Sequence, residues 1–243
     1  MTHGLNGRSI LVTGAGGGIG GQIVAQLVQA GAEVIAAGQS PAEIEEVCRL
    51  HNIRGIAFDV ADEDGVREAL GGLDLWGLVN CAGYGGQVAP LTSASTDMFD
   101  RVMAANARGT LLTTKYAAQS MIEAGRGGAI VNVSSQAALV ALDGHISYGA
   151  SKAAVDSITR VAALELGRHN IRVNSVNPTV VMTKMSASYW ARPEIADPFL
   201  AAMPLGRWAT EPEIAAPVVF LLSEGASMIT GVSLPVDGGY TIR

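Results

Sequence analysis

Short apolar runs that alternate with helix-forming stretches are the feature that most limits how this chain can fold. The runs are rich in Val, Ile, Leu and Ala, and they occupy residues 9–13, 33–37, 55–58, 75–80, 129–134, 171–177 and 233–236. Such a rhythm predicts βαβ units, and nearly continuous apolar strands are typical of a parallel sheet covered on both faces. We therefore predict an α/β fold, a single doubly wound parallel sheet flanked by helices, in one domain that spans residues 1–243.

The segments between the runs carry helix signals. Ser40, Pro41 and Glu43 predict a helix start with an N-cap, a proline in the first helical position and a capping-box glutamate. The Ala-rich segment 151–166 has apolar residues at helical spacing, which predicts a long helix with one apolar face. The segment 182–204 holds three prolines and scattered aromatics, so we expect a less regular excursion that serves as a lid.

Composition excludes several classes of protein. The formal net charge is −6 and no basic run is present, which disfavours a nucleic-acid partner. No apolar stretch approaches the roughly eighteen residues of a membrane span, and residues 1–10 lack a long apolar segment, so we expect a cytoplasmic protein. Cys48 and Cys81 are too few and too isolated for a disulfide framework or a zinc site, and we predict no metal.

A glycine-rich turn follows the first apolar run and opens a helix. Residues 13–20 read Thr-Gly-Ala-Gly-Gly-Gly-Ile-Gly. Glycines allow a tight turn and let backbone N–H groups approach phosphates, and the helix N-terminus adds a favourable dipole. A flexible turn without a ligand is the alternative. The position of the turn, after a strand and at the start of an alternating chain, favours a dinucleotide bound by a Rossmann-type fold.

Three polar residues point to carbonyl chemistry. Tyr148 and Lys152 are four residues apart at a predicted helix start, and Ser135 lies thirteen residues before Tyr148 at a predicted strand end. Hydride addition builds negative charge on a carbonyl oxygen, and tyrosine can protonate that oxygen if its pKa, normally about 10, is lowered. An ammonium group about 4 Å away could supply the shift, and Ser135 would bind the oxygen. An ordinary surface lysine is the alternative for Lys152.

The motifs, taken in order, resemble those of the short-chain dehydrogenase/reductase family over most of the chain. The matching positions are Gly14, Gly18 and Gly20 in the pattern TGxxxGxG, Asp59-Val60, Asn80-Cys81-Ala82-Gly83, Asn106, Ser135, Tyr148, Lys152, Asn177-Pro178, Thr183 and residues 234–240. Cys81 departs from the second asparagine that the family usually carries. Within the family, Thr179 after Pro178 and the segment around Gln136 are closest to a subgroup that reduces small ketoses and dicarbonyls.

This resemblance implies a cofactor, site residues and an assembly. The catalytic residues would be Asn106, Ser135, Tyr148 and Lys152. Asn106 would mark a helix distortion and position a water that relays protons to Lys152, while Lys152 would also hold the nicotinamide ribose. The turn and the family motifs assign cofactor binding to Gly14, Gly16, Gly17, Gly18, Ile19, Gly20, Gly38, Gln39, Asp59, Val60, Asn80, Ala82, Gly83, Tyr148, Lys152, Val181 and Thr183. The active form would be a homotetramer that uses the helix after Tyr148 and the helix around residues 98–121.

Cofactor choice depends on the end of the second strand and on the glycine turn. A carboxylate at position 38 would bind the ribose diol of NAD, whereas basic residues at positions 17 and 39 would hold the 2′-phosphate of NADP. The chain has Gly17, Gly38 and Gln39, so neither set is present. Because an uncompensated phosphate is the larger electrostatic liability, we favour NAD(H) slightly, although Gly38 and Ser40 leave room for NADP.

The predicted function is NAD(P)-dependent interconversion of a carbonyl and an alcohol on a small polyol, ketose or dicarbonyl. Substrate binding is assigned to Ser135, Gln136, His145, Tyr148 and Trp190. His145 as an exposed loop residue and Trp190 as a packing residue are the alternatives for those two positions. Two other functions remain open: a 3-oxoacyl reductase of lipid synthesis, and a catalytically silent nucleotide-sensing protein on the same fold.

Overall fold

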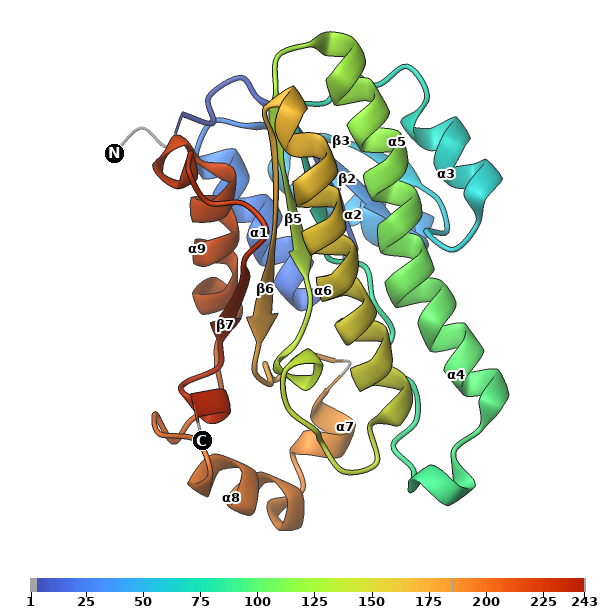
Figure 1. The fold of residues 1–243 in the computed structure, drawn as a ribbon, viewed down its shortest axis with the longest axis vertical. Coiled ribbons are helices and arrows are strands. Elements are labelled where there is room, and N and C mark those ends of the chain that lie inside the picture. Colours follow the sequence, from blue (N-terminus) through green and yellow to red (C-terminus); the bar gives the residue numbers. More distant parts are fainter. Residues whose placement is uncertain (1–3, 185, 243) are drawn as a thin grey trace.

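The chain folds around one sheet of seven strands, all of which pair in parallel (Figure 1). The structure is a computed structural model that describes residues 4–184 and 186–242. The strand order is β3-β2-β1-β4-β5-β6-β7. The strands are β1 (Ser9–Thr13), β2 (Glu33–Gly38), β3 (Arg54–Ala57), β4 (Gly77–Asn80), β5 (Gly128–Val133), β6 (Ile171–Pro178) and β7 (Ser233–Val236). The order reverses between β1 and β4, and at such a point the carboxyl ends of the strands leave a crevice for a ligand.

Helices cover both faces of the sheet. They are α1 (Gly18–Gln29), α2 (Pro41–His51), α3 (Glu63–Leu70), α4 (Thr96–Met103), α5 (Gly109–Ala124), α6 (Ile146–Leu166), α7 (Ala187–Trp190), α8 (Pro193–Ala201) and α9 (Glu211–Leu222). One core joins α1, α2 and α9 to the sheet, and a second joins α3, α5 and α6 to the other face. Figure 1 shows α7 and α8 beyond the ends toward which β6 and β7 point. The predicted fold class is therefore confirmed.

Successive side chains of a strand point to opposite faces of the sheet, which explains why there are two cores. Ile10 and Val12 of β1 face the α1–α9 layer, whereas Leu11 between them faces the α3–α5–α6 layer. All three side chains are fully buried. Burial of each such side chain is worth about 1.5–3 kcal/mol, which is why the strands read as continuous apolar runs.

Local sequence signals place the elements with small differences from the predictions. Ser40 caps α2, since its Oγ accepts a hydrogen bond from the Glu43 N–H at 3.4 Å. The Glu43 side chain, predicted to close a capping box, instead lies against Gly16 of the glycine-rich turn. Helix α6 begins at Ile146 rather than after Tyr148, so Tyr148 lies inside its first turn.

The segment 182–204 contains the short helices α7 and α8, and Met185 within it lies outside the described residues. Within residues 4–184 and 186–242, no helix combines the length and apolar character that crossing a membrane requires.

Candidate functional site

The glycine-rich turn is packed too closely for side chains. Gly14 adopts a φ of +66°, and a Cβ there would lie 2.7 Å from the backbone nitrogen of Ala82. A Cβ at Gly20 would collide with the carbonyl oxygen of Gly14. Gly17 is the N-cap of α1 and has no side-chain cap, so the N–H groups of the first helical turn face the loop. These features fit the diphosphate of a dinucleotide, with Gly14, Gly16, Gly17, Gly18, Ile19 and Gly20 around it.

Thr183, in the loop after β6, packs against the glycine-rich turn. A Cβ at Gly18 would lie 2.9 Å from Cγ2 of Thr183, so the loop after β6 contacts the start of α1. The N–H of Thr183 donates to Val181 O at 2.8 Å and to Ser186 Oγ at 2.9 Å. Residues predicted from two distant motifs thus meet at the amino end of one helix.

The predicted adenine side of the site lies at the ends of β2 and β3. The Gln39 side-chain amide donates to Asp59 Oδ2 at 3.0 Å, and Asp59 Oδ1 accepts from the Ala61 N–H at 2.9 Å. Gly38 lies next to Ile44 of α2, which a Cβ would approach to 3.0 Å. Val60 packs against Gly109, where a Cβ would come within 2.7 Å of Val60 Cγ2. The structure therefore places these four predicted residues along one edge.

Asn80 is held inside the protein rather than presented to the cleft. Its side-chain NH2 donates to Asn132 Oδ1 at 2.9 Å and to Thr114 Oγ1 at 3.1 Å, and its Oδ1 accepts from Thr113 Oγ1 at 2.7 Å. Only 3% of Asn80 is exposed. The residue predicted to touch the cofactor thus orders the end of β4, and the following backbone at Ala82 and Gly83 lines the turn.

Asn106 lies at the centre of a helix distortion. Residues Ala104–Arg108 form a π-helical stretch between α4 and α5, which frees backbone groups from the regular ladder. Asn106 is fully buried. It accepts from the Tyr84 N–H at 2.7 Å and donates to Tyr84 O at 3.0 Å and to Ser151 Oγ at 2.9 Å. The predicted distortion at Asn106 is confirmed by this stretch.

Lys152 and Tyr148 lie together in the first two turns of α6. The Lys152 ammonium donates to Val133 O at 2.8 Å and lies 5.7 Å from the centre of the Tyr148 ring. A Cβ on Gly83 would be 3.5 Å from that ammonium. Ser135, just beyond β5, is 8% exposed, and its Oγ accepts from the Ala137 N–H at 3.1 Å. The three residues predicted to act on a carbonyl thus share one corner of the cleft.

Burial dominates the electrostatics of this corner. It lowers the pKa of Lys152 to about 8, against the smaller opposing effects of Cys81 and Asp156. Burial also raises the pKa of Tyr148 above its usual value, and hydrogen bonding to Ser135 offsets this in part. Desolvation disfavours the charged phenolate, which is why burial raises the tyrosine pKa. The lowering of this pKa by Lys152 stays a prediction.

Cys81 lies beside this corner as a half-buried residue with a free thiol. Burial raises its pKa to about 11, so the group is neutral at physiological pH. Its N–H donates to Thr13 Oγ1 at 3.1 Å, in the same way as the N–H of Ala82 at 3.2 Å. Thr13 therefore links the end of β1 to the backbone after β4.

Asp156, which the motifs did not single out, forms a buried network with Asn177, which they did. The Asn177 amide donates to Asp156 Oδ2 at 2.8 Å and to the backbone oxygen of Ser135 at 3.0 Å. Ser175 Oγ donates to Asp156 Oδ1 at 2.9 Å. A carboxylate four residues after Lys152, about one helical turn along the same face, was the available signal. The network fixes the backbone that presents Ser135.

His145 and Trp190 meet in an aromatic cluster over the cleft. Their rings are stacked with centroids 5.6 Å apart, and Tyr189 meets both edge-on. Trp190 also contacts Phe199 at 4.7 Å and Trp208 at 6.2 Å between centroids. Trp190 is therefore a packing residue, in addition to its predicted role in substrate binding. The cluster gathers five of the twelve Phe, Trp and Tyr residues of the chain: Tyr189, Trp190, Phe199, Trp208 and Tyr240. The sequence analysis named only Trp190 of these five. The concentration of aromatic residues in the last third of the sequence could have indicated the other four.

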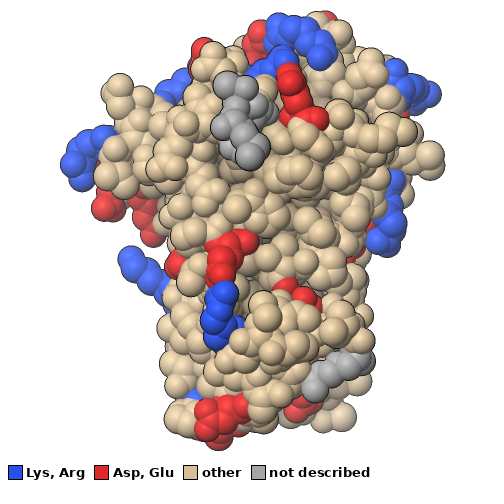
Figure 2. All heavy atoms as spheres, turned by 90° about the vertical axis from the view of Figure 1, so that its left-hand side faces the viewer, with Lys and Arg blue, Asp and Glu red and all other residues tan. Residues whose placement is uncertain are grey.

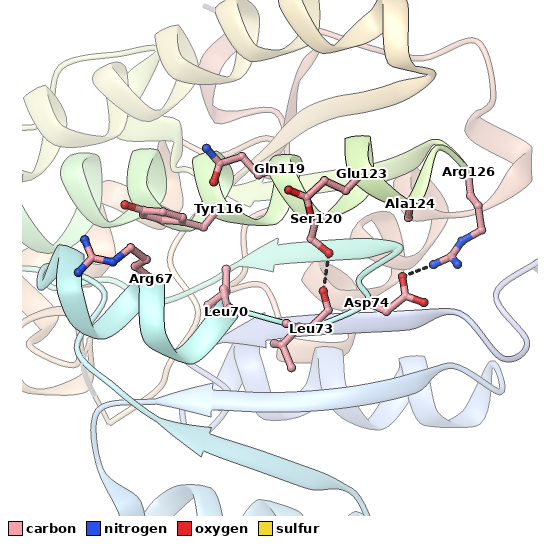
Figure 3. Close-up of a pocket in the computed structure, with 12 residues that line it drawn as sticks. Arg67, Leu70, Leu73, Asp74, Tyr116, Gln119, Ser120, Glu123, Ala124 and Arg126 are labelled. Atoms are coloured by element: carbon pink, nitrogen blue, oxygen red, sulfur yellow. Dashed lines mark hydrogen bonds and ion pairs between the residues drawn. The ribbon is translucent and has the colours of Figure 1, made fainter.

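A separate hollow of about 580 Å³ lies between α3 and α5 (Figure 3). Leu73 and Asp74 precede β4 and Ser120 lies near the end of α5, so the hollow is at the amino ends of the strands, opposite the glycine turn. Its polar groups bind one another: Ser120 Oγ donates to Leu73 O, and Arg126 pairs with Asp74. It holds none of the predicted catalytic or binding residues.

Comparison with known proteins defines the class. A family model described as "Enoyl-(Acyl carrier protein) reductase" matches residues 14–241. Relatives more than 30% identical over nearly the whole chain agree with it. The chain belongs to the short-chain dehydrogenase/reductase family, a class of NAD(P)-dependent oxidoreductases that act on CH–OH groups. The predicted family and enzyme class are confirmed.

Particular relatives narrow the comparison. L-xylulose reductase of Bos taurus is 41% identical over 240 residues, which cover 97% of each protein. D-threitol dehydrogenase of Mycolicibacterium smegmatis is 41% identical over 253 residues, which cover 98% of this chain and 95% of the relative. A crystal structure described as a putative NAD(P) dependent gluconate 5-dehydrogenase from Beutenbergia cavernae, with bound NADP at low occupancy, superposes with a TM-score of 0.95. It shares 32% identity, and the alignment covers all of both chains.

Proposed function

We propose that the protein interconverts a small polyol and its ketose, or reduces a small dicarbonyl, in the manner of an L-xylulose reductase. The observation that carries the proposal is the Gln136 side chain. It is only 1% exposed, adjoins Ser135, and neither its amide oxygen nor its amide nitrogen has a partner within the described part of the chain. A buried polar group without a partner costs about 1–3 kcal/mol. A substrate with hydroxyl groups beside its carbonyl would satisfy this amide.

Thr179 strengthens the same argument. Its hydroxyl is the other side-chain oxygen that is buried without a partner among residues 4–184 and 186–242, and the residue is 6% exposed. It follows β6 as Gln136 follows β5, and these strands are neighbours. Sites with buried polar groups of this kind reject ligands that lack matching hydroxyls, which favours a sugar over an acyl chain. The relatives named for L-xylulose and D-threitol agree with that choice.

Each side chain of the corner has a proposed task. The nicotinamide supplies or accepts the hydride. Tyr148 would donate its phenolic proton to the carbonyl oxygen, and Ser135 would hydrogen-bond that oxygen as charge develops. Lys152 would hold the nicotinamide ribose and stabilise the phenolate. A positively charged ring next to Tyr148 would lower its pKa, against the effect of burial. Asn106 would hold a proton-relaying water near Lys152.

The segment 182–204 would act as a lid. Its ring contacts with His145 at the start of α6 would exclude water from the corner that holds Tyr148. Short helices joined by loops can move as a unit because ring packing, unlike a hydrogen-bond network, is weakly directional.

A homotetramer in the cytoplasm is part of the proposal. Leu111 and Ile122 of α5, and Val161 and Leu164 of α6, are exposed apolar side chains on the helices expected to form an interface. Figure 2 shows the side of the molecule around α9, where uncharged residues cover most of the surface and charged ones are scattered. Exposed apolar side chains on these two helices favour subunit contacts. Two reduced thiols suit a reducing compartment.

The test compares substrates of different chemistry. L-xylulose, diacetyl and a 3-oxoacyl thioester are each offered with NADH and with NADPH, and nicotinamide absorbance is followed for the wild type and Tyr148→Phe. We expect turnover of the ketose or the dicarbonyl that disappears in the variant. Preference for the thioester would instead support a 3-oxoacyl reductase. Nucleotide binding without any turnover would support a silent sensor.

A further inference from the structure

The corner between the glycine-rich turn and the end of β2 carries negative charge. In a dinucleotide fold the adenosine ribose lies between the first βα turn and the end of the second strand, where its 2′ group is read. Positions 14–20 and 38–43 hold no Lys, Arg or His and one carboxylate, Glu43. A 2′-phosphate would enter this corner without a basic partner from these segments.

The Glu43 side chain is directed at the turn. A Cβ on Gly16 would lie 2.9 Å from Glu43 Cβ and 3.0 Å from Glu43 Oε2, so the carboxylate rests directly against the loop that cradles the nucleotide. Its backbone N–H is bound by the Ser40 hydroxyl, which anchors the residue in the first turn of α2. The carboxylate therefore stands next to the ribose position, five residues after Gly38.

Gln39 does not supply the missing donor. Its side-chain NH2 is bound to Asp59 Oδ2 at 3.0 Å, on the adenine side of the corner. Asp59 adds a further carboxylate to that side. The residue at the position where a basic group would hold a 2′-phosphate is thus committed to an acidic partner.

We infer that Glu43 is a specificity-determining residue that disfavours the 2′-phosphate of NADP and leaves the ribose diol of NAD as the preferred ligand. The inference rests on the proposed function, because it concerns the nucleotide of the same site. A carboxylate and a phosphate dianion about 6 Å apart in surroundings close to water repel enough to change a binding constant about tenfold. Salt weakens this repulsion, since the screening length is about 10 Å at 0.1 M.

The experiment measures binding without turnover. Dissociation constants of adenosine 5′-monophosphate and adenosine 2′,5′-bisphosphate are determined by calorimetry at low and high salt for the wild type, Glu43→Gln and Glu43→Lys. We expect Glu43→Gln to favour the bisphosphate about tenfold relative to the monophosphate, and Glu43→Lys to favour it further. The gain should shrink at high salt.

Two other variants separate a local effect from a general one. Glu45→Gln removes the same charge two residues along α2, about 200° around the helix, and should leave the ratio unchanged. Glu211→Gln removes a carboxylate whose Oε1 is 3.3 Å from the position of a Cβ on Gly18. That residue adjoins the diphosphate end of the turn, so its removal should strengthen NAD and NADP binding by the same factor.

The possible results distinguish the role of Glu43 from the proposed function. An unchanged ratio in Glu43→Gln, or an equal change in Glu45→Gln, overturns the role of Glu43 while nucleotide binding stands. Failure of the wild type to bind either adenosine nucleotide at millimolar concentration, together with no binding of NADH or NADPH, overturns the proposed function and the inference with it.

Discussion

The catalytic corner around Ser135, Tyr148 and Lys152 and the proposed lid, residues 182–204, are held in place by different forces. Around Asn106, Lys152 and Asn177, buried side chains are tied to backbone and to each other by hydrogen bonds of 2.7–3.0 Å. In the segment 182–204, Trp190 and Phe199 contact rings outside the segment at 4.5–6.2 Å between centroids: those of His145, Trp208 and Tyr240. Directional bonds position single atoms, whereas ring packing tolerates sliding. The molecule thus combines a rigid chemical corner with an adaptable cover.

The contrast between the hydrogen-bonded corner and the lid is tested most strongly at Tyr148. Tyr148→Phe removes only the hydroxyl, and we expect kcat to fall about a thousandfold, within the range of lost general acid–base catalysis. Nucleotide binding should change less than about twofold, because the ring remains. Single-turnover nicotinamide absorbance and a fluorescence titration measure the two effects. Residual activity above about a tenth of the wild type would remove Tyr148 from its proposed role.

Asn106 tests the rigidity of the corner. Asn106→Ala deletes three hydrogen bonds of a fully buried side chain and leaves the Tyr84 N–H without its acceptor. We expect the free energy of unfolding to fall by about 2–4 kcal/mol in urea denaturation. Gln119→Ala, on the exposed side of α5, is the matched control and should cost at most about 0.5 kcal/mol. Equal losses in both variants would contradict a preorganised corner.

The buried Lys152 makes the free energy of unfolding depend on pH. The pKa of Lys152 is about 8 in the folded protein, against an ordinary value of 10.5 that applies to the unfolded chain, so between these values the unfolded chain binds more protons. Stability from this group therefore rises as pH increases from about 8 to 10.5 and is lost as pH falls through 8. We expect the stability of the wild type relative to Lys152→Met to increase by about 2 kcal/mol between pH 7.5 and 10.

This pH effect is measured by urea denaturation of both proteins without nucleotide. Other titrating groups are shared by the two proteins and cancel in the difference. A flat difference across this range would mean that burial does not disfavour the charged lysine.

The smallest expected effect belongs to the lid. Trp190→Ala removes the ring that stacks on His145 but no hydrogen bond of the corner. We expect KM for the ketose to rise about tenfold, with kcat within about threefold of the wild type. Tyr189→Phe keeps its ring and should leave both constants unchanged. A fall in kcat as large as that of Tyr148→Phe would mean that the lid is part of the rigid corner.

Much of this arrangement could be predicted because its signals are local. The glycine turn, the strand runs and the spacing from Tyr148 to Lys152 are each written in short stretches, and each appears where expected. The side-chain environment of Asn80 could not be predicted for the opposite reason: its amide bonds with Asn132 and Thr114 join residues 52 and 34 positions away. No local pattern reports whether such a side chain faces a cleft or the interior.

The sequence by itself determined the parallel α/β order and singled out the side chains that we propose to react, since strand periodicity, helix caps and short motifs depend on neighbouring residues. Only the tertiary structure decided how those side chains are tuned and covered. Burial raises the pKa of Tyr148 and lowers that of Lys152, the Glu43 carboxylate rests on Gly16, and Trp190 stacks on His145. Each of these depends on which distant segments pack together, because desolvation and close contact are properties of the assembled core.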